Sequence, residues 1–258
     1  MAKEIFTIVN NKGGVGKTTT ALNLGAAFYE LGYNVLLIDT DPQMNLSKNL
    51  GYSKTDKLPT IYEALCGRSE LIIRKRGSET KSKKRFDYIP ASPDLVNVEI
   101  ELFKKISKEY ILKRLLEPIK DQYDYIILDC PPSLGITTIN SMTASTGLII
   151  PVQCEPYAIE GISEITSTYL EVRNNVNSDL KIKGYLLTMV HNRLVMTAQF
   201  ETGLRETFKE LIFKSKINHN VSLSEAQGKR QTIYEYKPSS TGAKDYMEFA
   251  KEIINQKR

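Results

Sequence analysis

The sequence contains no apolar run long enough to span a bilayer, and its first predicted strand begins at Glu4, which leaves no room for a signal peptide. Cysteine is scarce. The chain has only Cys66, Cys130 and Cys154, which are too far apart for a zinc knuckle or a Cys-x-x-Cys redox pair. An odd number of cysteines is typical of a reducing compartment. We therefore expect a cytoplasmic protein.

Histidine is also rare, and no charge of one sign dominates. His191 and His219 fall in predicted loops without a carboxylate or cysteine at ligand spacing, so we expect exposed loop residues and not metal ligands. The 35 Lys and Arg residues exceed the 30 Asp and Glu residues slightly, and the charge of +5 modestly favours a polyanionic partner. No internal repeat is visible. We expect one domain over residues 1–258.

Apolar, β-branched segments alternate with amphipathic helical patterns along the chain. The apolar runs of the predicted strands are 5–9, 35–38, 125–128, 148–152 and 185–190. The predicted helices are 18–31, 102–119, 159–174, 198–213 and 240–254. Because the strands are continuously apolar and are separated by helices, the pattern indicates an α/β fold with a mostly parallel twisted sheet and helices on both faces.

A glycine-rich loop joins the first predicted strand to the first predicted helix. Residues 12–18 read Lys-Gly-Gly-Val-Gly-Lys-Thr, and glycines let backbone N–H groups approach phosphate oxygens in front of a helix N-terminus. Lys17 would reach the β- and γ-phosphates, and the Thr18 hydroxyl would bind Mg²⁺. This predicts a P-loop NTPase-like fold. The residues expected to bind nucleotide here are Lys12, Gly13, Gly14, Val15, Gly16, Lys17, Thr18 and Thr19.

The loop departs from the pattern Gly-x4-Gly-Lys-Ser/Thr at one position, because Asn11 replaces the first glycine. A second lysine, Lys12, precedes Lys17 by five residues. The segment resembles the deviant Walker A subclass, in which the early lysine reaches across a dimer interface to the partner's nucleotide. The alternative is a surface lysine beside a glycine turn.

Carboxylates follow two more of the predicted strands. Asp39 and Asp41 end one strand and Asp129 ends another, at the sheet edge where open α/β folds bind ligands. Side chains alternate along an extended chain, so Asp39 and Asp41 can point to the same side. Asp129 would hold Mg²⁺ through water. The alternative for the first pair is a solvated turn closed by Pro42.

With these motifs the chain is similar to ParA/Soj-type partition ATPases of the MinD/ParA superfamily. The matching segments are 12–20, 39–43 and 129–132, together with a Soj-like tail between 223 and 246. The resemblance implies that Lys12, Lys17 and Asp41 act in catalysis, with Asp41 positioning or activating the hydrolytic water. It also implies that Thr18, Asp39 and Asp129 form the metal site, and that the cofactors are ATP and Mg²⁺.

The same resemblance implies a cycle. ATP closes a homodimer, the dimer binds DNA without sequence preference, and a ParB-type protein stimulates slow hydrolysis during chromosome or plasmid partition. This would place the protein on the nucleoid. The alternative is a MinD-like ATPase that positions another assembly or cycles on a membrane. That role needs a C-terminal amphipathic helix, and only 255–258 follow the last predicted helix, so we expect no membrane partner.

The residues that contact adenine and DNA are predicted from individual positions and not from a motif. Asn192 matches a MinD pattern for adenine recognition but could equally be a turn residue, and 218–221 would form the other wall of the base site. Arg193 matches a DNA-binding arginine of Soj-type proteins, whereas Ser222 replaces the second one. Lys229 and Arg230 could restore that contact nearby. The basic segment 74–85 is either a solvated loop or a further nucleic-acid contact.

Overall fold

The sheet has eight strands in the order β3-β4-β2-β5-β1-β6-β7-β8. The computed structural model describes residues 4–53, 55–76, 84–155, 158–191 and 195–256. β3 is antiparallel to β4, and every other neighbouring pair is parallel. The mostly parallel α/β sheet is therefore confirmed. The strands are β1 (Glu4–Ile8), β2 (Val35–Asp39), β3 (Arg74–Lys75), β4 (Phe86–Ile89), β5 (Tyr125–Asp129), β6 (Gly147–Gln153), β7 (Lys181–Val190) and β8 (Ile212–Asn218).

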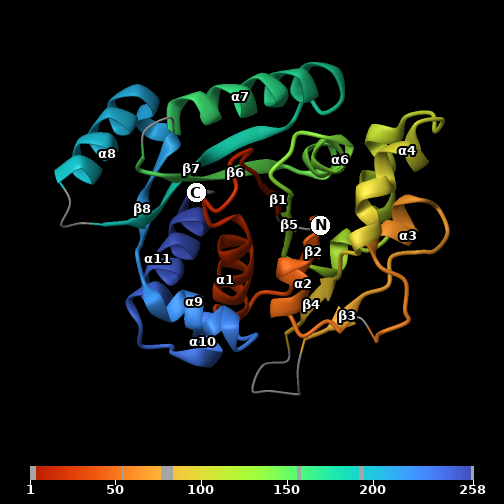
Figure 1. Cartoon of the computed structure of the whole chain (residues 1–258), viewed down its shortest axis with the longest axis horizontal. Helices are drawn as coiled ribbons and strands as arrows, with labels where there is room; N and C mark the ends of the chain where they lie inside the picture. The colour runs from red at the N-terminus through yellow and green to blue at the C-terminus, as the bar shows by residue number, and fades with distance from the viewer. Residues whose placement is uncertain (1–3, 54, 77–83, 156–157, 192–194, 257–258) are drawn as a thin grey trace.

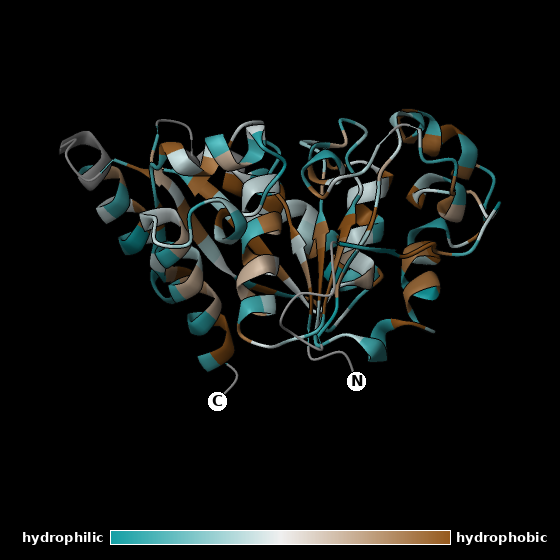
Figure 2. Ribbon diagram, turned by 90° about the horizontal axis from the view of Figure 1, so that it is seen from below, coloured by the Kyte–Doolittle hydropathy of each residue, from teal (hydrophilic) through white to brown (hydrophobic). Residues whose placement is uncertain are grey.

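Helices cover both faces of this sheet, as predicted (Figure 1). α1 and α11 pack on one face, whereas α6, α7 and α8 pack on the other, and Figure 2 shows apolar residues concentrated on the strands between them. The helices are α1 (Lys17–Glu30), α2 (Asn45–Asn49), α3 (Ile61–Leu65), α4 (Val98–Leu102), α5 (Ile111–Leu116), α6 (Ile136–Ala144), α7 (Ala158–Asn175), α8 (Val195–Phe208), α9 (Val221–Gly228), α10 (Ile233–Tyr236) and α11 (Thr241–Asn255).

Close packing fixes α1 over the centre of the sheet. Gly25 faces β2 so closely that a Cβ there would lie 2.6 Å from a methyl carbon of Leu37. One turn further on, the Phe28 ring stacks on Tyr125 of β5 with 3.9 Å between centroids and 6° between planes. Because α1 begins directly after the glycine-rich loop, this packing also fixes the direction in which the loop faces.

The structure corrects two of the predicted helices. The helix expected over 102–119 is broken, since α4 ends at Leu102, α5 starts at Ile111 and Ser107 between them has a left-handed φ of +51°. Ile106, an apolar residue within that predicted helix, is 92% exposed. The helix expected over 198–213 ends at Phe208, and strand β8 begins at Ile212.

Three strands were missed because none is a continuous apolar run. β3 has two residues, and β8 contains the polar stretch Lys214-Ser215-Lys216 at an edge of the sheet. β4 includes Asp87, which is buried and accepts a hydrogen bond from the Tyr123 hydroxyl at 2.8 Å. Sheet pairing and one long-range hydrogen bond therefore outweigh the weak local pattern.

The described part of the basic segment 74–85 is largely structural. Arg74 is 8% exposed and donates to the carbonyls of Leu58, Pro59 and Ile72 at 2.7 to 2.9 Å, and its Nε lies 3.1 Å from Asp56. Arg74 is therefore neither a solvated cation nor free to contact DNA. Residues 77–83 lie outside the described ranges.

Arg76 joins three separate segments of the fold. Its guanidinium donates to the Asn49 carbonyl at the end of α2, to the Arg230 carbonyl beyond α9, and to Glu235 of α10, at 2.7 to 3.0 Å. This residue fixes the spacing between α2 and the C-terminal helices, so it too is unavailable to nucleic acid.

Across the described ranges, no helix has both the length and the apolar composition needed to cross a membrane.

We expect Arg74→Ala to lower the free energy of unfolding by roughly 2 to 4 kcal/mol, because it leaves Asp56 and several carbonyls without their donor. The exposed neighbour Lys75 supplies the matched control, and Lys75→Ala should change stability by less than about 0.5 kcal/mol. Urea denaturation followed by circular dichroism measures both. Equal midpoints for the two variants would contradict the anchoring role of Arg74.

Candidate nucleotide-binding site

The glycine-rich loop lies between β1 and α1 at the carboxyl edge of the sheet. Gly14 and Gly16 have left-handed φ values of +78° and +89°, which a side chain would strain. Gly16 occupies the cap position of α1 without a side-chain hydrogen bond, and the first turn of α1 contains no acidic residue. The N–H groups of that turn are thus available to an anion, as in a phosphate-binding loop.

Lys17 is the cation of this loop. It is 7% exposed, and its Nζ donates to the Lys12 carbonyl at 2.9 Å. Burial lowers the pKa of Lys17, and the nearby carboxylate of Asp129 opposes that shift. A phosphate entering the loop would compete with this backbone carbonyl for the ammonium group.

Lys12 lies at the surface of the same loop. Its Nζ forms an ion pair with Glu155 at 2.7 Å, and the two side chains are 46% and 51% exposed. Pairs this exposed contribute at most about 1 kcal/mol, so Lys12 can leave Glu155 at little cost. Sequence reasoning missed Glu155, although its position two residues after the end of β6, at the carboxyl edge, was a signal.

Asn11, which replaces the first glycine of the common motif, ties the loop to a helix on the other face of the sheet. Its side-chain amide donates to the Glu164 carboxylate on α7. Replacing the first glycine of the motif with Asn11 therefore adds a side-chain contact between the P-loop and α7.

Asp39 and Asp41 differ in role. Asp39 is buried and accepts hydrogen bonds from the Asp41 N–H at 3.0 Å and from the Ser47 N–H and hydroxyl at 2.8 and 2.6 Å. Burial raises the pKa of Asp39 to about 6, against the effect of these hydrogen bonds. Asp41 accepts the Gln43 N–H at 2.8 Å and lines the cavity beside the loop. Asp39 thus holds the 39–47 segment, and Asp41 faces the ligand space.

Asp129 is fully buried, and neither of its carboxylate oxygens has a hydrogen-bond partner within the described structure. Burial and the neighbouring Asp39 carboxylate raise its pKa well above the ordinary value, whereas the nearby Thr18 hydroxyl and Lys17 oppose the shift. An uncompensated carboxylate beside a P-loop hydroxyl is the environment that a hard cation satisfies.

Mg²⁺ fits these residues if substrate phosphates supply part of its coordination. No group of three or more His, Cys, Asp or Glu side chains in the described ranges could hold a metal alone. Mg²⁺ usually takes one or two carboxylates and completes its octahedron with water and substrate phosphates. The predicted metal residues Thr18, Asp39 and Asp129 are brought together, but the hydrogen bonds of Asp39 place it in support of the site.

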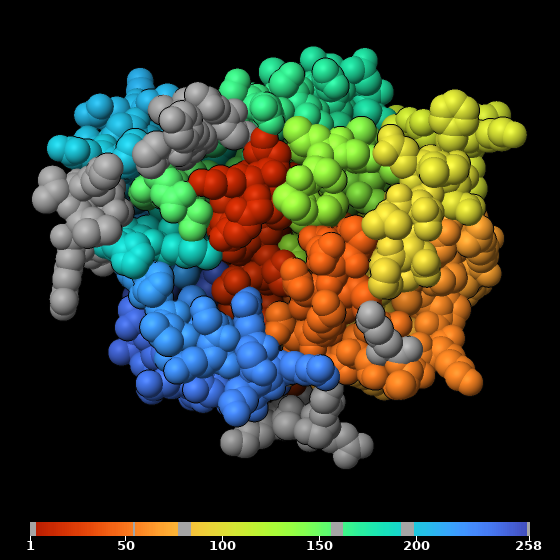
Figure 3. Space-filling model, in the orientation of Figure 1, coloured from red at the N-terminus to blue at the C-terminus, as the bar shows by residue number. Residues whose placement is uncertain are grey.

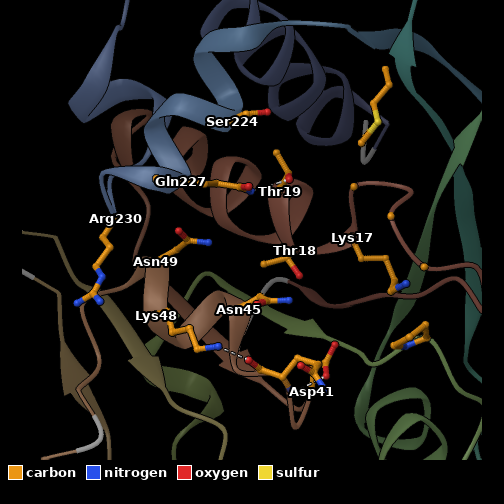
Figure 4. A pocket seen from close by; sticks show the side chains of 17 residues that line it. Lys17, Thr18, Thr19, Asp41, Asn45, Lys48, Asn49, Ser224, Gln227 and Arg230 are labelled. Carbon is orange, nitrogen blue, oxygen red and sulfur yellow. Dashed lines mark hydrogen bonds between the residues drawn. The ribbon is translucent and has the colours of Figure 1, made fainter.

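A cavity of about 710 Å³ opens at this edge, and it is large enough for a nucleotide. The loop lies between the 41–50 segment and the α9 region on the face shown in Figure 3. Figure 4 shows Lys17, Thr18 and Asp41 from one wall, with Gln227 and Arg230 from the other.

A second cavity of about 90 Å³ adjoins the first and shares Gly16, Thr19 and Gln227 with it. Asn218, His219 and Asn220 line this small cavity, so the loop predicted as one wall of the base site does lie beside the P-loop. Asn192 lies outside the described residues.

The two histidines are exposed, as predicted, and their rings stack with 4.4 Å between centroids.

The predicted DNA residues are only partly described. Lys229 and Arg230 are exposed, and Arg230 also lines the nucleotide cavity. Ser222 is only 8% exposed and its N–H donates to Asn220 at 2.9 Å, so it belongs to the start of α9 and not to an open surface. Arg193 lies outside the described residues.

Comparison with known proteins agrees with this geometry. The family model described as "AAA domain" matches residues 3–182. The sporulation initiation inhibitor protein Soj of Bacillus subtilis is 44% identical over 97% of this chain and 98% of its own. The chromosome partitioning protein ParA of Caulobacter vibrioides is 38% identical over 98% of this chain and 95% of its own. The chain belongs to the ParA/Soj family of partition ATPases.

One solved structure connects this ParA-type fold to ligands. The Mycobacterium smegmatis protein described as cobyrinic acid a,c-diamide synthase, with bound ATP analogue and magnesium, is 31% identical to this chain. It superposes with a TM-score of 0.83 over 98% of this chain and 95% of its own. The P-loop of this ParA-type chain therefore lies in a fold that holds a magnesium nucleotide in that relative.

We expect Lys17→Ala to abolish Mg·ATP binding, because it removes the buried ammonium group of the loop. Thr18→Ala should bind ATP with an affinity that no longer rises when Mg²⁺ is added. Isothermal titration calorimetry measures both. Lys113→Ala, which removes an exposed lysine of α5, is the matched control and should bind normally. Unchanged Mg·ATP affinity in Lys17→Ala would refute the site.

Proposed function

We propose that this ParA-type chain is an ATPase that dimerises with ATP, hydrolyses it slowly and acts in chromosome or plasmid partition. The observation that carries the proposal is the arrangement of the two loop lysines. Lys17 is buried against the ligand cavity, whereas Lys12 lies at the surface and is held only by an exposed ion pair to Glu155. A surface lysine on a P-loop suits a nucleotide bound by a second copy of the chain.

ATP and Mg²⁺ are the proposed cofactors. The N–H groups of 13–19 and the Lys17 ammonium would bind the phosphates, while Asn218 to Asn220 would flank the base. Thr18 and Asp129 would hold Mg²⁺, which neutralises phosphate charge when bound. Asp41, oriented by the Gln43 N–H, would position the attacking water.

Slow hydrolysis follows from the same arrangement. Phosphoryl transfer depends mainly on positioning and on neutralising charge in the transition state. In a single chain Lys12 is paired with Glu155, so the site lacks that charge until a dimer forms. In GTPases a cation supplied in this way is worth about 10³ to 10⁵ in rate. A ParB-type partner would act by favouring the closed dimer.

DNA binding without sequence preference completes the proposal. Lys229 and Arg230 are exposed at the end of α9, and Arg193 would join them. Long, flexible cations of this kind contact phosphates and carry no sequence information. Binding to the nucleoid would follow from this contact.

The two-state cycle predicts opposite behaviour for two variants. Asp41→Ala should bind ATP, remain dimeric and hydrolyse little, because it loses only water positioning. Lys12→Ala should bind ATP but form no stable dimer, because the cross-interface contact is gone. Light scattering of each variant with ATP and with ADP measures the mass. A monomeric Asp41→Ala, or a dimeric Lys12→Ala, would contradict the sandwich dimer.

DNA affinity should fall linearly with salt on a log-log plot, with a slope of about −0.9 for each phosphate contact. Charge reversal at Arg193, Lys229 and Arg230 should weaken binding to unrelated duplexes alike and leave ATP affinity intact. Fluorescence anisotropy with ATP, ADP and no nucleotide measures this. Lys113→Glu on α5 matches the charge change of each single reversal and is the control for it. Binding that ignores nucleotide, or that survives the triple reversal, would refute the surface.

A further inference from the structure

Gln227 joins the C-terminal part of the chain to the first turn of α1. Its Nε2 donates to the Thr19 hydroxyl oxygen at 2.7 Å across 208 positions of sequence. Figure 4 shows both side chains on the cavity wall, with Gln227 directed toward Thr19. Gln227 also lines both the large cavity beside the P-loop and the small cavity beside Asn218 to Asn220.

The direction of this hydrogen bond decides what Thr19 can do. A hydroxyl has one proton and can accept as well as donate. Since the Thr19 oxygen accepts from Gln227, its own proton is free to be donated elsewhere. Thr19 stands one residue after Thr18 in the N-terminal turn of α1, whose free N–H groups face the cavity, so a phosphate oxygen there is the natural acceptor.

Gln227 is not the only residue that docks the C-terminal helices on α1 within the described ranges. Asn23 accepts the Ile233 N–H at 2.9 Å, and the Thr20 hydroxyl lies 3.2 Å from that of Tyr246. Both contacts are buried, and neither Asn23 nor Thr20 lines the cavity. Of these three contacts, the Gln227–Thr19 hydrogen bond is the one whose two residues both line the large cavity.

We propose that Gln227 is a positioning residue for the nucleotide: by donating to Thr19 it keeps the Thr19 hydroxyl proton directed at the phosphate between the P-loop and the base cavity. The inference rests on the proposed nucleotide site. The ligand that Gln227 and Thr19 would position is a nucleoside diphosphate or triphosphate. ADP and ATP share the phosphates nearest the sugar, so both should depend on Gln227 equally.

A double-mutant cycle with Mg·ADP tests this, because ADP reports affinity without the ATP-dependent dimer. We expect Gln227→Met, which keeps the length but removes the donor, and Thr19→Val, which removes the hydroxyl, each to weaken binding roughly tenfold. The double variant should bind no more weakly than Thr19→Val alone. Thr19→Ser retains the hydroxyl and is the matched control, with affinity near that of the unchanged protein.

Gln227→Glu tests the direction of the hydrogen bond. A carboxylate can only accept, so it would take the Thr19 proton away from the phosphate and add a negative charge beside it. This variant should bind ADP more weakly than Gln227→Met, and part of the difference should disappear at high salt. Thermal unfolding without nucleotide should give the same midpoint for Gln227→Met and the unchanged protein.

The outcomes separate this inference from the proposed function. Normal ADP binding by Gln227→Met, or additive losses in the double variant, would overturn the role of Gln227 while leaving the site intact. Loss of ADP binding that persists equally in Thr19→Ser would also overturn it. Failure of the unchanged protein to bind ADP, or retained binding by Lys17→Ala, would instead refute the nucleotide site itself.

Discussion

The carboxylate of Asp129 is buried at the end of the central strand β5, beside the buried carboxylate of Asp39, and neither of its oxygens has a hydrogen-bond partner in the described ranges. Burial of such a group favours its neutral form unless a cation compensates it. Lys17 and a magnesium nucleotide supply that compensation. The P-loop, the 39–47 segment and β5 all converge on this carboxylate.

The two lysines of the P-loop each form one weak contact within the chain. Lys17 is bonded to the backbone of its own loop, and Lys12 is paired with Glu155 at the surface. Neither contact is strong: the first is a single hydrogen bond and the second is an exposed ion pair. A ligand or a second subunit would replace each contact at small cost, as the proposed dimerisation cycle requires.

α9 and the residues that follow it form the wall of the nucleotide cavity that lies opposite the 41–49 segment. Arg76 fixes α2 against the segment beyond α9, and Gln227 joins α9 to the first turn of α1. The segment 39–49, which contains Asp39 and Asp41, is thereby connected to the exposed Lys229 and Arg230. In the proposed function, this connection is a physical route from nucleotide state to the DNA-binding residues, because Arg76 joins Asn49 and Arg230, which both line the nucleotide cavity.

The sequence by itself determined the P-loop, its two lysines, the carboxylates and the five central strands, because each depends on local rules: glycine geometry, apolar runs and alternation along strands. It did not predict β3, β4 or β8, the break near Ser107, or the roles of Arg74, Arg76, Glu155 and Gln227. These depend on partners distant in sequence, such as Thr19 for Gln227 and Glu235 for Arg76. A polar side chain in sequence resembles a solvated one, and only the tertiary structure decides which become buried donors, because burial and long-range hydrogen bonds are absent from the local pattern.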